Sequence, residues 1–558
     1  MSKFSMILLF LITANCLGQF NSEFHSSGGV NREWVNRFNG PGNRFDIATT
    51  MRLDGTTGVI VYGNTASLTS FSDITAIKYS PSGILLWQST FNGFGNSVDE
   101  TKAAVIDAAG NSYVTGFTAD TNQVVKIVTL KINASGVILW SKVFLPPANN
   151  QGIGISITND NTGNTYTCGY TRRANGSNSI VLIKYSTNGD LLGSVFFNKT
   201  QTSSETPVSV CVDNAGFVYI LASSNAIGGV NDILMLKYSS SLNLIWQNTF
   251  SGNAVGNDIP VQMLLSNDNR LVVAAAMNNL PGGLDYGVFR FDTSSALAMQ
   301  YFYNGTGNNQ DIPYAITTDT ANNIFVTGSS RNSDTLGSED FFTMKIDPTA
   351  FLVWEKRYNG NGRGFDYGTS IAVDKWGNVF AGGTTDKHDF HQQYALLKYG
   401  PTGDLLWLEE YSKIEYSEDF IYTTLADNNG NIYVTGISFD STTDYDIATI
   451  KYSEVIGIGS ISTEVPRELA LLGNYPNPFN PVTKIKFQIP QNVKSETSNV
   501  KLIVSNLLGE AVAVIINDNL KAGIYEAEFD GSNFSSGVYF CTLSNGKEIK
   551  SMKIILIK

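Results

Sequence analysis

Cysteine is scarce in this sequence, which limits both the fold and the chemistry. The 558 residues contain four cysteines, at Cys16, Cys168, Cys211 and Cys541. Cys16 lies in a predicted signal peptide, so the mature chain keeps three. Domains held together by disulfides need a denser, even-numbered set, so a disulfide framework is excluded. Cys168 and Cys211 are candidates for one bond, but we expect buried thiols that pack as small hydrophobic side chains.

Histidine is scarcer still, with His25, His388 and His391 alone. His388 and His391 share a short segment with Asp389, which offers fewer ligands than a zinc site needs, so we expect exposed loop residues. The sequence also lacks a nucleophile elbow, a phosphate-binding loop and a metalloprotease motif. We therefore predict no catalytic residue and no metal ligand.

Charge and long apolar runs are also sparse. Charged residues make up 15% of the chain, and the formal net charge is -12. Because binding to phosphates depends on clustered Lys and Arg, which are missing, nucleic acid is not expected as a partner. After residue 18 no apolar run is long enough to cross a membrane.

The first eighteen residues differ from the rest of the chain. They run from Lys3 through the apolar stretch 7–12 to Gly18, the pattern of a secretory signal peptide cleaved near Gln19. Lipidation at Cys16 is the alternative, although Asn15 is not the small residue that such a site prefers. Residues 1–18 are thus predicted to direct export.

A repeat of 53 residues fills most of the chain, with one step of 55 residues. A small residue recurs eight times, at Gly63, Gly116, Gly169, Ala222, Ala275, Gly328, Gly383 and Gly436. A basic residue follows each of them, at Lys78, Lys131, Lys184, Lys237, Arg290, Lys345, Lys398 and Lys451. Eight units of one supersecondary structure are therefore expected, with the small residues at crowded contacts between units.

Each unit reads as four short strands without helical periodicity. An Asp followed three residues later by Gly or Asn, as at Asp107 and Gly110, predicts a hairpin with a left-handed residue. Single sheets of this size must pack on one another, and a closed ring of them is a β-propeller. We predict an all-β, eight-bladed propeller over residues 19–455, closed by pairing of segment 34–38 with segment 447–452.

The repeat resembles a known family of exported bacterial proteins. Its D-x-x-GN-x-YVTG core, as in DNNGNIYVTG at 427–436, followed by the IKY strand, is similar to the SBBP-type β-propeller repeat. The resemblance covers roughly residues 30 to 455. It implies a fold and no common catalytic residues.

The C-terminal part has a different pattern. A linker is expected at 456–467, and alternating apolar segments at 468–558 predict a small Ig-like β-sandwich. NYPNPFNP, LLGEAV and SSGVYF followed by a Lys at the chain end resemble the type A C-terminal sorting domain of the type IX secretion system. That resemblance implies the secretion machinery as partner and delivery to the surface or exterior of a Gram-negative bacterium.

An acidic residue opens seven of the eight units. These acids are Asp46, Asp99, Glu205, Asp258, Asp311, Asp366 and Asp419, and the third unit has Gly152 instead. A ring of carboxylates near one end of the channel, able to hold a polyol or a cation such as calcium, is one interpretation. The other is structural: ion pairs between blades involving the repeating bases and a second set of acids, at Asp73, Asp232, Asp285, Asp340 and Asp446.

These observations favour a secreted or surface-attached monomer that binds an extracellular glycan or protein, or serves in adhesion or as a scaffold, without catalysis. No cofactor is required. The alternative is an extracellular propeller enzyme acting on glycans in a central funnel. Likeness among all eight blades favours binding, whereas a blade-specific pair of acids favours the enzyme.

Overall fold

The computed structural model describes most of the chain, and every regular element in the described part is a β-strand. No helix there is long and apolar enough to span a membrane. The predicted signal peptide lies outside the described residues. These are 30–55, 58–68, 70–146, 151–225, 229–252, 256–280, 283–307, 309–331, 339–362, 364–388, 391–414, 417–454, 459–462, 466–491, 497–531 and 534–558.

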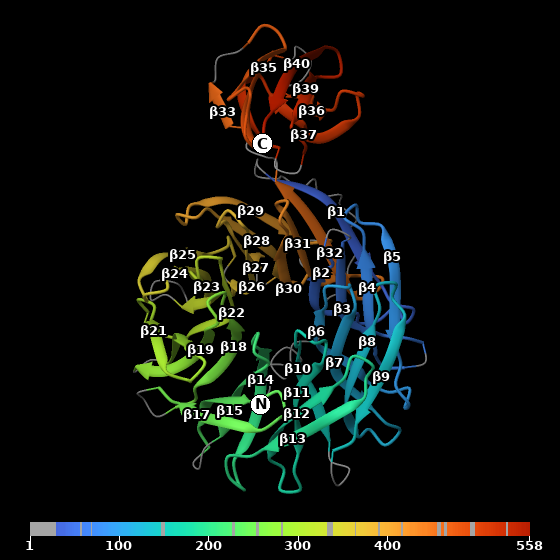
Figure 1. The fold of residues 1–558 in the computed structure, drawn as a ribbon, viewed down its shortest axis with the longest axis vertical. Helices are drawn as coiled ribbons and strands as arrows, with labels where there is room; N and C mark the ends of the chain where they lie inside the picture. The colour runs from blue at the N-terminus through green and yellow to red at the C-terminus, as the bar shows by residue number, and fades with distance from the viewer. Residues whose placement is uncertain are drawn as a thin grey trace.

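Eight four-stranded antiparallel sheets form the blades of a ring (Figure 1). Seven of them use four consecutive strands in chain order, the first innermost. Blade one has β2 (Ile47–Leu53), β3 (Val59–Thr65), β4 (Asp73–Tyr79) and β5 (Leu85–Phe91). Blade two has β6 (Asp99–Ile106), β7 (Ser112–Ala119), β8 (Val125–Ile132) and β9 (Ile138–Phe144). Blade three has β10 (Gly152–Asn159), β11 (Thr165–Arg172), β12 (Asn178–Tyr185) and β13 (Leu191–Phe197). Blade four has β14 (Ser204–Val212), β15 (Val218–Asn225), β16 (Asn231–Tyr238) and β17 (Leu244–Phe250).

The other half of the ring repeats this arrangement. Blade five has β18 (Ile259–Leu265), β19 (Leu271–Leu280), β20 (Gly283–Phe291) and β21 (Leu297–Tyr303). Blade six has β22 (Asp311–Thr318), β23 (Ile324–Arg331), β24 (Glu339–Ile346) and β25 (Leu352–Tyr358). Blade seven has β26 (Tyr367–Val373), β27 (Val379–His388), β28 (His391–Tyr399) and β29 (Leu405–Tyr411). Blade eight has β30 (Asp419–Ala426), β31 (Asn431–Asp440), β32 (Asp444–Glu454) and, as its outer strand, β1 (Val30–Phe38).

The ring closes through this N-terminal strand, as the sequence predicts. In β1, Trp34 lies opposite Lys451 and Phe38 opposite Ile447, in antiparallel register with β32. The innermost strands contact one another around the ring, and β30 contacts β2. Without β1, blade eight would have three strands and an unpaired edge at β32, so this pairing completes the sheet.

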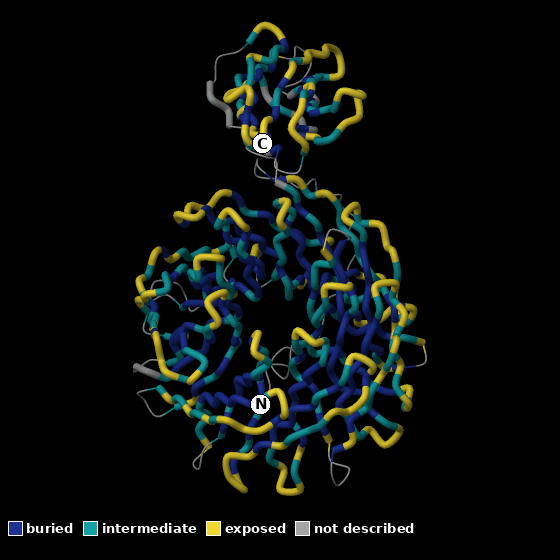
Figure 2. The backbone as a smooth tube through the Cα atoms, viewed as in Figure 1, coloured by how far each residue is buried: buried dark blue, intermediate teal, exposed yellow. Residues whose placement is uncertain are grey.

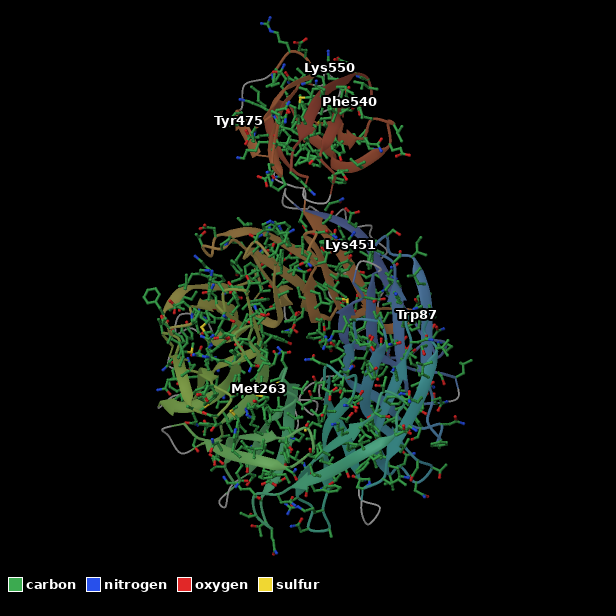
Figure 3. The ribbon with its side chains drawn as sticks, viewed as in Figure 1. Trp87, Met263, Lys451, Tyr475, Phe540 and Lys550 are labelled. Carbon is green, nitrogen blue, oxygen red and sulfur yellow. The ribbon has the colours of Figure 1, made fainter. Side chains whose placement is uncertain are left out.

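The core lies between blades. Each hydrophobic cluster of the ring joins neighbouring sheets, as where Tyr166 and Cys168 of blade three pack with Val218 and Leu236 of blade four. Figure 2 shows buried residues in the middle of the blades and exposed residues along the loops and the outer strands. Met263 lies on innermost strand β18 and Trp87 on outer strand β5, at the rim (Figure 3). Each blade is therefore stabilised by its interfaces with the two neighbouring blades.

The recurring small residues allow close contact between two strands of the same blade. A Cβ on Gly63 would lie 2.1 Å from the carbonyl oxygen of Ile47, and one on Gly116 would lie 1.8 Å from that of Glu100. Both atoms belong to the innermost strand of the same blade, beside a β-bulge. The sequence suggested contacts between blades, so this part of the interpretation was incomplete.

The hairpin prediction is confirmed. The residue three after the turn Asp has positive φ at Gly110 (80°), Gly163 (82°) and Asn269 (59°), the last following Ser266 in place of Asp. Asp107 Oδ1 accepts hydrogen bonds from the backbone N–H groups of Ala109 and Asn111. These carboxylates cap turns, which is the ordinary role of Asp in such loops.

Two four-stranded sheets form the C-terminal sandwich. One is ordered β33-β38-β35-β34 and the other β37-β36-β39-β40, with a core that includes Phe487, Leu502 and Ile554. The predicted linker at 456–467 needs correction, because Gly459–Ser462 is a strand that pairs with β38. The strands are β33 (Gly459–Ser462), β34 (Ala470–Tyr475), β35 (Val482–Ile489), β36 (Thr497–Ser505), β37 (Ala511–Lys521), β38 (Gly523–Asp530), β39 (Gly537–Ser544) and β40 (Ile549–Leu556).

Candidate binding site

The seven repeating acids lie where the innermost strands begin, which we call the acidic end of the ring. The opposite end, where the third strand of each blade finishes, is the basic end. All seven side chains are buried, with relative exposures of 0–1%: Asp46, Asp99, Glu205, Asp258, Asp311, Asp366 and Asp419. Their positions repeat around the ring, but the carboxylates are not presented to solvent.

Most of these carboxylates hold the loop of their own blade. Asp46 accepts hydrogen bonds from the N–H of Gly40 (2.5 Å), the hydroxyl of Thr65 (2.6 Å) and the N–H of Ala66 (3.0 Å). The glycine six residues earlier serves in the same way for Asp99, Asp258, Asp311 and Asp366. A ligand in the channel would have to displace these donors before it reached the carboxylates.

The repeating bases lie at the basic end, away from these acids. Lys131 donates to the carbonyl of Thr187 (3.1 Å) in the next blade, and its ammonium lies 5.1 Å from the ring centre of Tyr113. Lys184 and Lys237 bind the next blade in the same way. The bases thus join blades as we suggested, but through carbonyls of the next blade and not through the seven acids. The aromatic faces belong to the blade of the base itself, and Lys78 and Arg290 also pair with the turn acids Asp54 and Asp268 of their own blades.

The second set of acids approaches the first across blade interfaces. Burial, with a further contribution from the Asp311 carboxylate, raises the pKa of Asp285 to about 6. Burial also raises the pKa of Asp366 to about 6, and Asp340 adds to this effect. No group of three His, Cys, Asp or Glu residues within the described ranges could hold a metal ion. Pairs of carboxyl groups therefore face each other across these interfaces.

Blade three departs from this arrangement, because Gly152 stands where the other blades have an acid. A pocket of about 230 Å³ opens there, at the acidic end. Its walls come from three blades: Val125 of blade two; Gln151, Gly152, Ile153, Tyr170, Arg172, Gly176 and Asn178 of blade three; and Ser204 of blade four. Within the described lining there is one cation and no carboxylate, imidazole or thiol.

Strand register explains how these side chains come together. Ile153 lies opposite Tyr170 in β11, and Arg172 lies opposite Asn178 in β12. Alternate residues of a strand share a face, so Tyr170, Arg172 and Asn178 project from the same side of the sheet. Sequence reasoning noted the missing acid at Gly152 but overlooked Tyr170 and Arg172. The available signal was a basic residue twenty positions after the vacancy.

The remaining predicted groups lie elsewhere. Cys168, Cys211 and Cys541 are free thiols, in agreement with the expectation for Cys168 and Cys211. Burial raises the pKa of Cys211 to about 12. His391 begins β28 in blade seven, whereas Asp389 and the side chain of His388 lie outside the described residues.

Two families match parts of the chain. Residues 474–558 match the secretion system C-terminal sorting domain, and residues 303–334 match the SBBP β-propeller repeat. Both resemblances seen in the sequence are thereby confirmed. The tail is a sorting domain of the type IX secretion system, which directs the protein to the cell surface or the exterior of a Gram-negative bacterium. A search of curated proteins gave no match.

Two solved structures are similar over most of the chain. One is PorZ, a surface component of the type IX secretion system of Porphyromonas gingivalis, with 15% identity and a TM-score of 0.38 over 90% of this chain and 69% of that one. The other is the WD40 domain of SCAP from fission yeast, with 8% identity and a TM-score of 0.40 over 75% of this chain and 97% of that one. Likenesses this remote say nothing of function.

Proposed function

We propose that this type IX exported propeller is a binding protein without catalytic activity, and that it engages an extracellular ligand at the acidic end of the ring. The observation that carries the proposal is the pocket of about 230 Å³ at Gly152, the position where the repeat is broken. The propeller supplies the rigid scaffold, and the departure from symmetry supplies the site.

The lining of the pocket favours recognition over catalysis. A nucleophilic serine needs an adjacent general base. The described lining includes Ser204 and Tyr170 but no His, Asp, Glu, Cys or Lys. Gln151, Asn178 and Ser204 instead provide amide and hydroxyl groups that donate and accept hydrogen bonds. The pocket is smaller than typical sites for drug-sized molecules, so it suits one residue of a longer chain.

A glycan array combined with a hydrolysis screen tests the proposal. The purified protein should retain a subset of glycans and release no reducing ends from them. Gly152→Asp, which restores the repeating acid, should weaken retention. Its Cβ would lie 3.2 Å from Cγ1 of Ile127 and 3.3 Å from Cγ of Pro146, which can adjust slightly, and a melting curve checks the fold. Turnover of any retained glycan would establish the alternative, an extracellular glycan-acting enzyme.

A further inference from the structure

Two consecutive arginines at the end of β11 have different roles. Arg173 is used internally: its guanidinium donates to the backbone carbonyls of Gln201 (3.0 Å), Thr200 (3.3 Å) and Ser203. It thereby holds the loop that leads into Ser204 and forms one wall of the pocket. Arg172 is exposed, and within the described part of the chain its guanidinium forms no hydrogen bond or ion pair.

Blade six has the other arginine that the sequence places at this position of the repeat. Arg331 is the counterpart of Arg172, and it lies directly opposite Glu339 in the neighbouring strand. The backbone N–H of Arg331 also bonds the repeating acid Asp311. In blade three both acids are missing, since Asn178 replaces the glutamate and Gly152 replaces the aspartate.

The loss of both acids leaves a positive charge on the pocket wall without a carboxylate in the described lining. The next of the repeating acids, Glu205, is fully buried, and its Oε1 accepts a hydrogen bond from the hydroxyl of Ser224 (3.4 Å). An accessible arginine in a pocket without a carboxylate among its described lining residues is suited to an anionic group. Guanidinium binds carboxylates especially well because its donors match their geometry.

The other side chains suit hydroxyl groups around that anion. Burial raises the pKa of the Tyr170 phenol, and Arg172 nearby counteracts this only in part. The phenol is therefore protonated at neutral pH, able to donate a hydrogen bond, and its ring offers a flat apolar surface. Asn178 Nδ2 donates to Thr206 (3.1 Å), which fixes the amide beside Arg172. Gln151 and Ser204 complete a polar wall.

We propose that this pocket binds a uronic acid residue of an acidic polysaccharide, with its carboxylate on Arg172 and its hydroxyl groups on the neutral polar wall. The proposal deepens the proposed function, on which it rests. A carboxylate ringed by hydroxyls matches one cation surrounded by amide, phenol and hydroxyl groups. An acidic peptide would share the carboxylate but would leave most of these neutral groups unpaired, at a cost in affinity.

Calorimetry with trigalacturonic acid and its fully methyl-esterified form tests the charge directly, because the two differ at the carboxylates alone. The full protein should bind the acid about ten- to a hundredfold more tightly than the ester. Arg172→Gln should remove that preference. Arg331→Gln is the matched control in blade six and should leave it unchanged.

A second variant keeps Arg172 and places a carboxylate opposite it, so that the charge of its guanidinium is neutralised within the protein. Asn178→Glu recreates the cross-strand pair of blade six, so binding of trigalacturonate should fall by about tenfold or more while Arg172 remains. Unchanged melting curves for the Gln and Glu variants would show that the effect is on the ligand. Arg172→Lys should retain part of the preference.

The results separate this inference from the proposed function. Equal binding of acid and ester by the wild-type protein, or full preference in Arg172→Gln, would overturn the uronate assignment even if the array shows glycan binding. Tighter binding of a glutamate-rich peptide than of trigalacturonate would overturn it as well. Failure of the array with every glycan would instead remove the proposed function.

Discussion

The indole Nε1 of Trp34 donates a hydrogen bond of 3.1 Å to the carbonyl oxygen of Pro81, 47 residues further along the chain. The same spacing joins Trp87 to Ala134, Trp140 to Thr187, Trp246 to Thr293 and Trp354 to Pro401. In each case a tryptophan of an outer strand binds a turn of the next blade. Trp34 does so from the N-terminal strand, which therefore acts as the missing outer strand of blade eight.

Trp34→Ala should destabilise the closed ring. The indole packs near Tyr79 and Tyr433, with ring centres 5.9 and 6.2 Å away. Since Trp34 is only partly buried, we expect a loss of about 2 kcal/mol, below the range for a fully buried Trp. Thermal or denaturant unfolding measures the change. Trp87→Ala, at the equivalent position inside a continuous blade, is the control, and the two losses should be similar.

If Trp34→Ala left the free energy of unfolding unchanged while Trp87→Ala lowered it, β1 would not complete the ring in solution. Deleting residues 19–40 should have the larger effect, because it removes all of β1 and exposes the edge of β32. Broadened unfolding is expected for this variant.

The buried carboxyl pairs should make stability depend on pH. The pKa of Asp285 is about 6 in the folded ring, against about 3.9 when unfolded. The folded state therefore holds the proton of Asp285 more tightly than the unfolded state does. The resulting contribution to the free energy of unfolding is fully present below about pH 4 and is lost as the pH rises through 6. Asp285→Asn should raise the melting temperature at pH 7.5 by about 1–3 °C and change little at pH 4.

Asp446→Asn is the control with the opposite sign. Arg37 Nη2 lies 3.0 Å from the Asp446 carboxylate, so this variant removes an ion pair of the closing interface and should melt lower at pH 7.5. A lower melting temperature for Asp285→Asn as well would mean that the Asp285 charge is stabilised in the folded ring and would contradict the direction of its pKa shift.

The repeating acids should behave as structural groups when removed. Asp366 accepts hydrogen bonds from the N–H groups of Gly360 (3.0 Å) and Asp386 (2.9 Å) and from the hydroxyl of Thr385. Asp366→Ala leaves these donors buried without an acceptor and should lower the free energy of unfolding by about 2–3 kcal/mol. Asp404→Ala, which alters an exposed turn carboxylate, should have little effect on denaturant unfolding.

Calcium should not stabilise the ring through these acids. Most of their oxygens already accept hydrogen bonds from the protein, as at Asp46 and Asp366, and a calcium site needs six or more oxygen ligands. Melting curves with millimolar calcium and with EDTA should therefore coincide. A clear upward shift with calcium that Asp366→Ala abolishes would restore the ring of acids as a cation site.

Periodicity made the fold predictable, whereas the binding site arises from departures from it. Eight blades and closure by Trp34 follow from a register that every unit repeats. The positions of the acids were also predictable, but their burial depends on donors such as Gly40 and Thr65, which come close only after folding. Arg172 was overlooked because it stands out only by the absence of the two acids that would neutralise its charge. Recognising that absence requires the cross-strand pairs, which are known only from the structure.

The sorting domain should be separable from the propeller. The ring is complete at β32, whose partner β1 comes from the other end of the propeller, so its core needs nothing from the sandwich. The sandwich begins earlier than the sequence suggested, because β33 pairs with β38. A truncation should therefore end at Glu454 and remove the whole sandwich, since a cut at Leu469 would leave β33 without its sheet.

The truncated protein should fold, cross the inner membrane and stay in the periplasm, because the predicted signal peptide addresses that membrane alone. Fractionation of a host with the type IX machinery, with limited proteolysis to check the fold, measures this.

Fusing residues 459–558 to an unrelated exported reporter should carry the reporter to the surface or the medium, since this segment includes the matched sorting domain at 474–558. A second fusion that starts at 468 is the matched control: it lacks β33 and should be less stable if that strand belongs to the sandwich. If the truncated protein reached the exterior, the tail would not be necessary as an address, and if both fusions stayed in the periplasm, it would not be sufficient. The assignment of the propeller would stand in either case, because it depends on the register of the repeat.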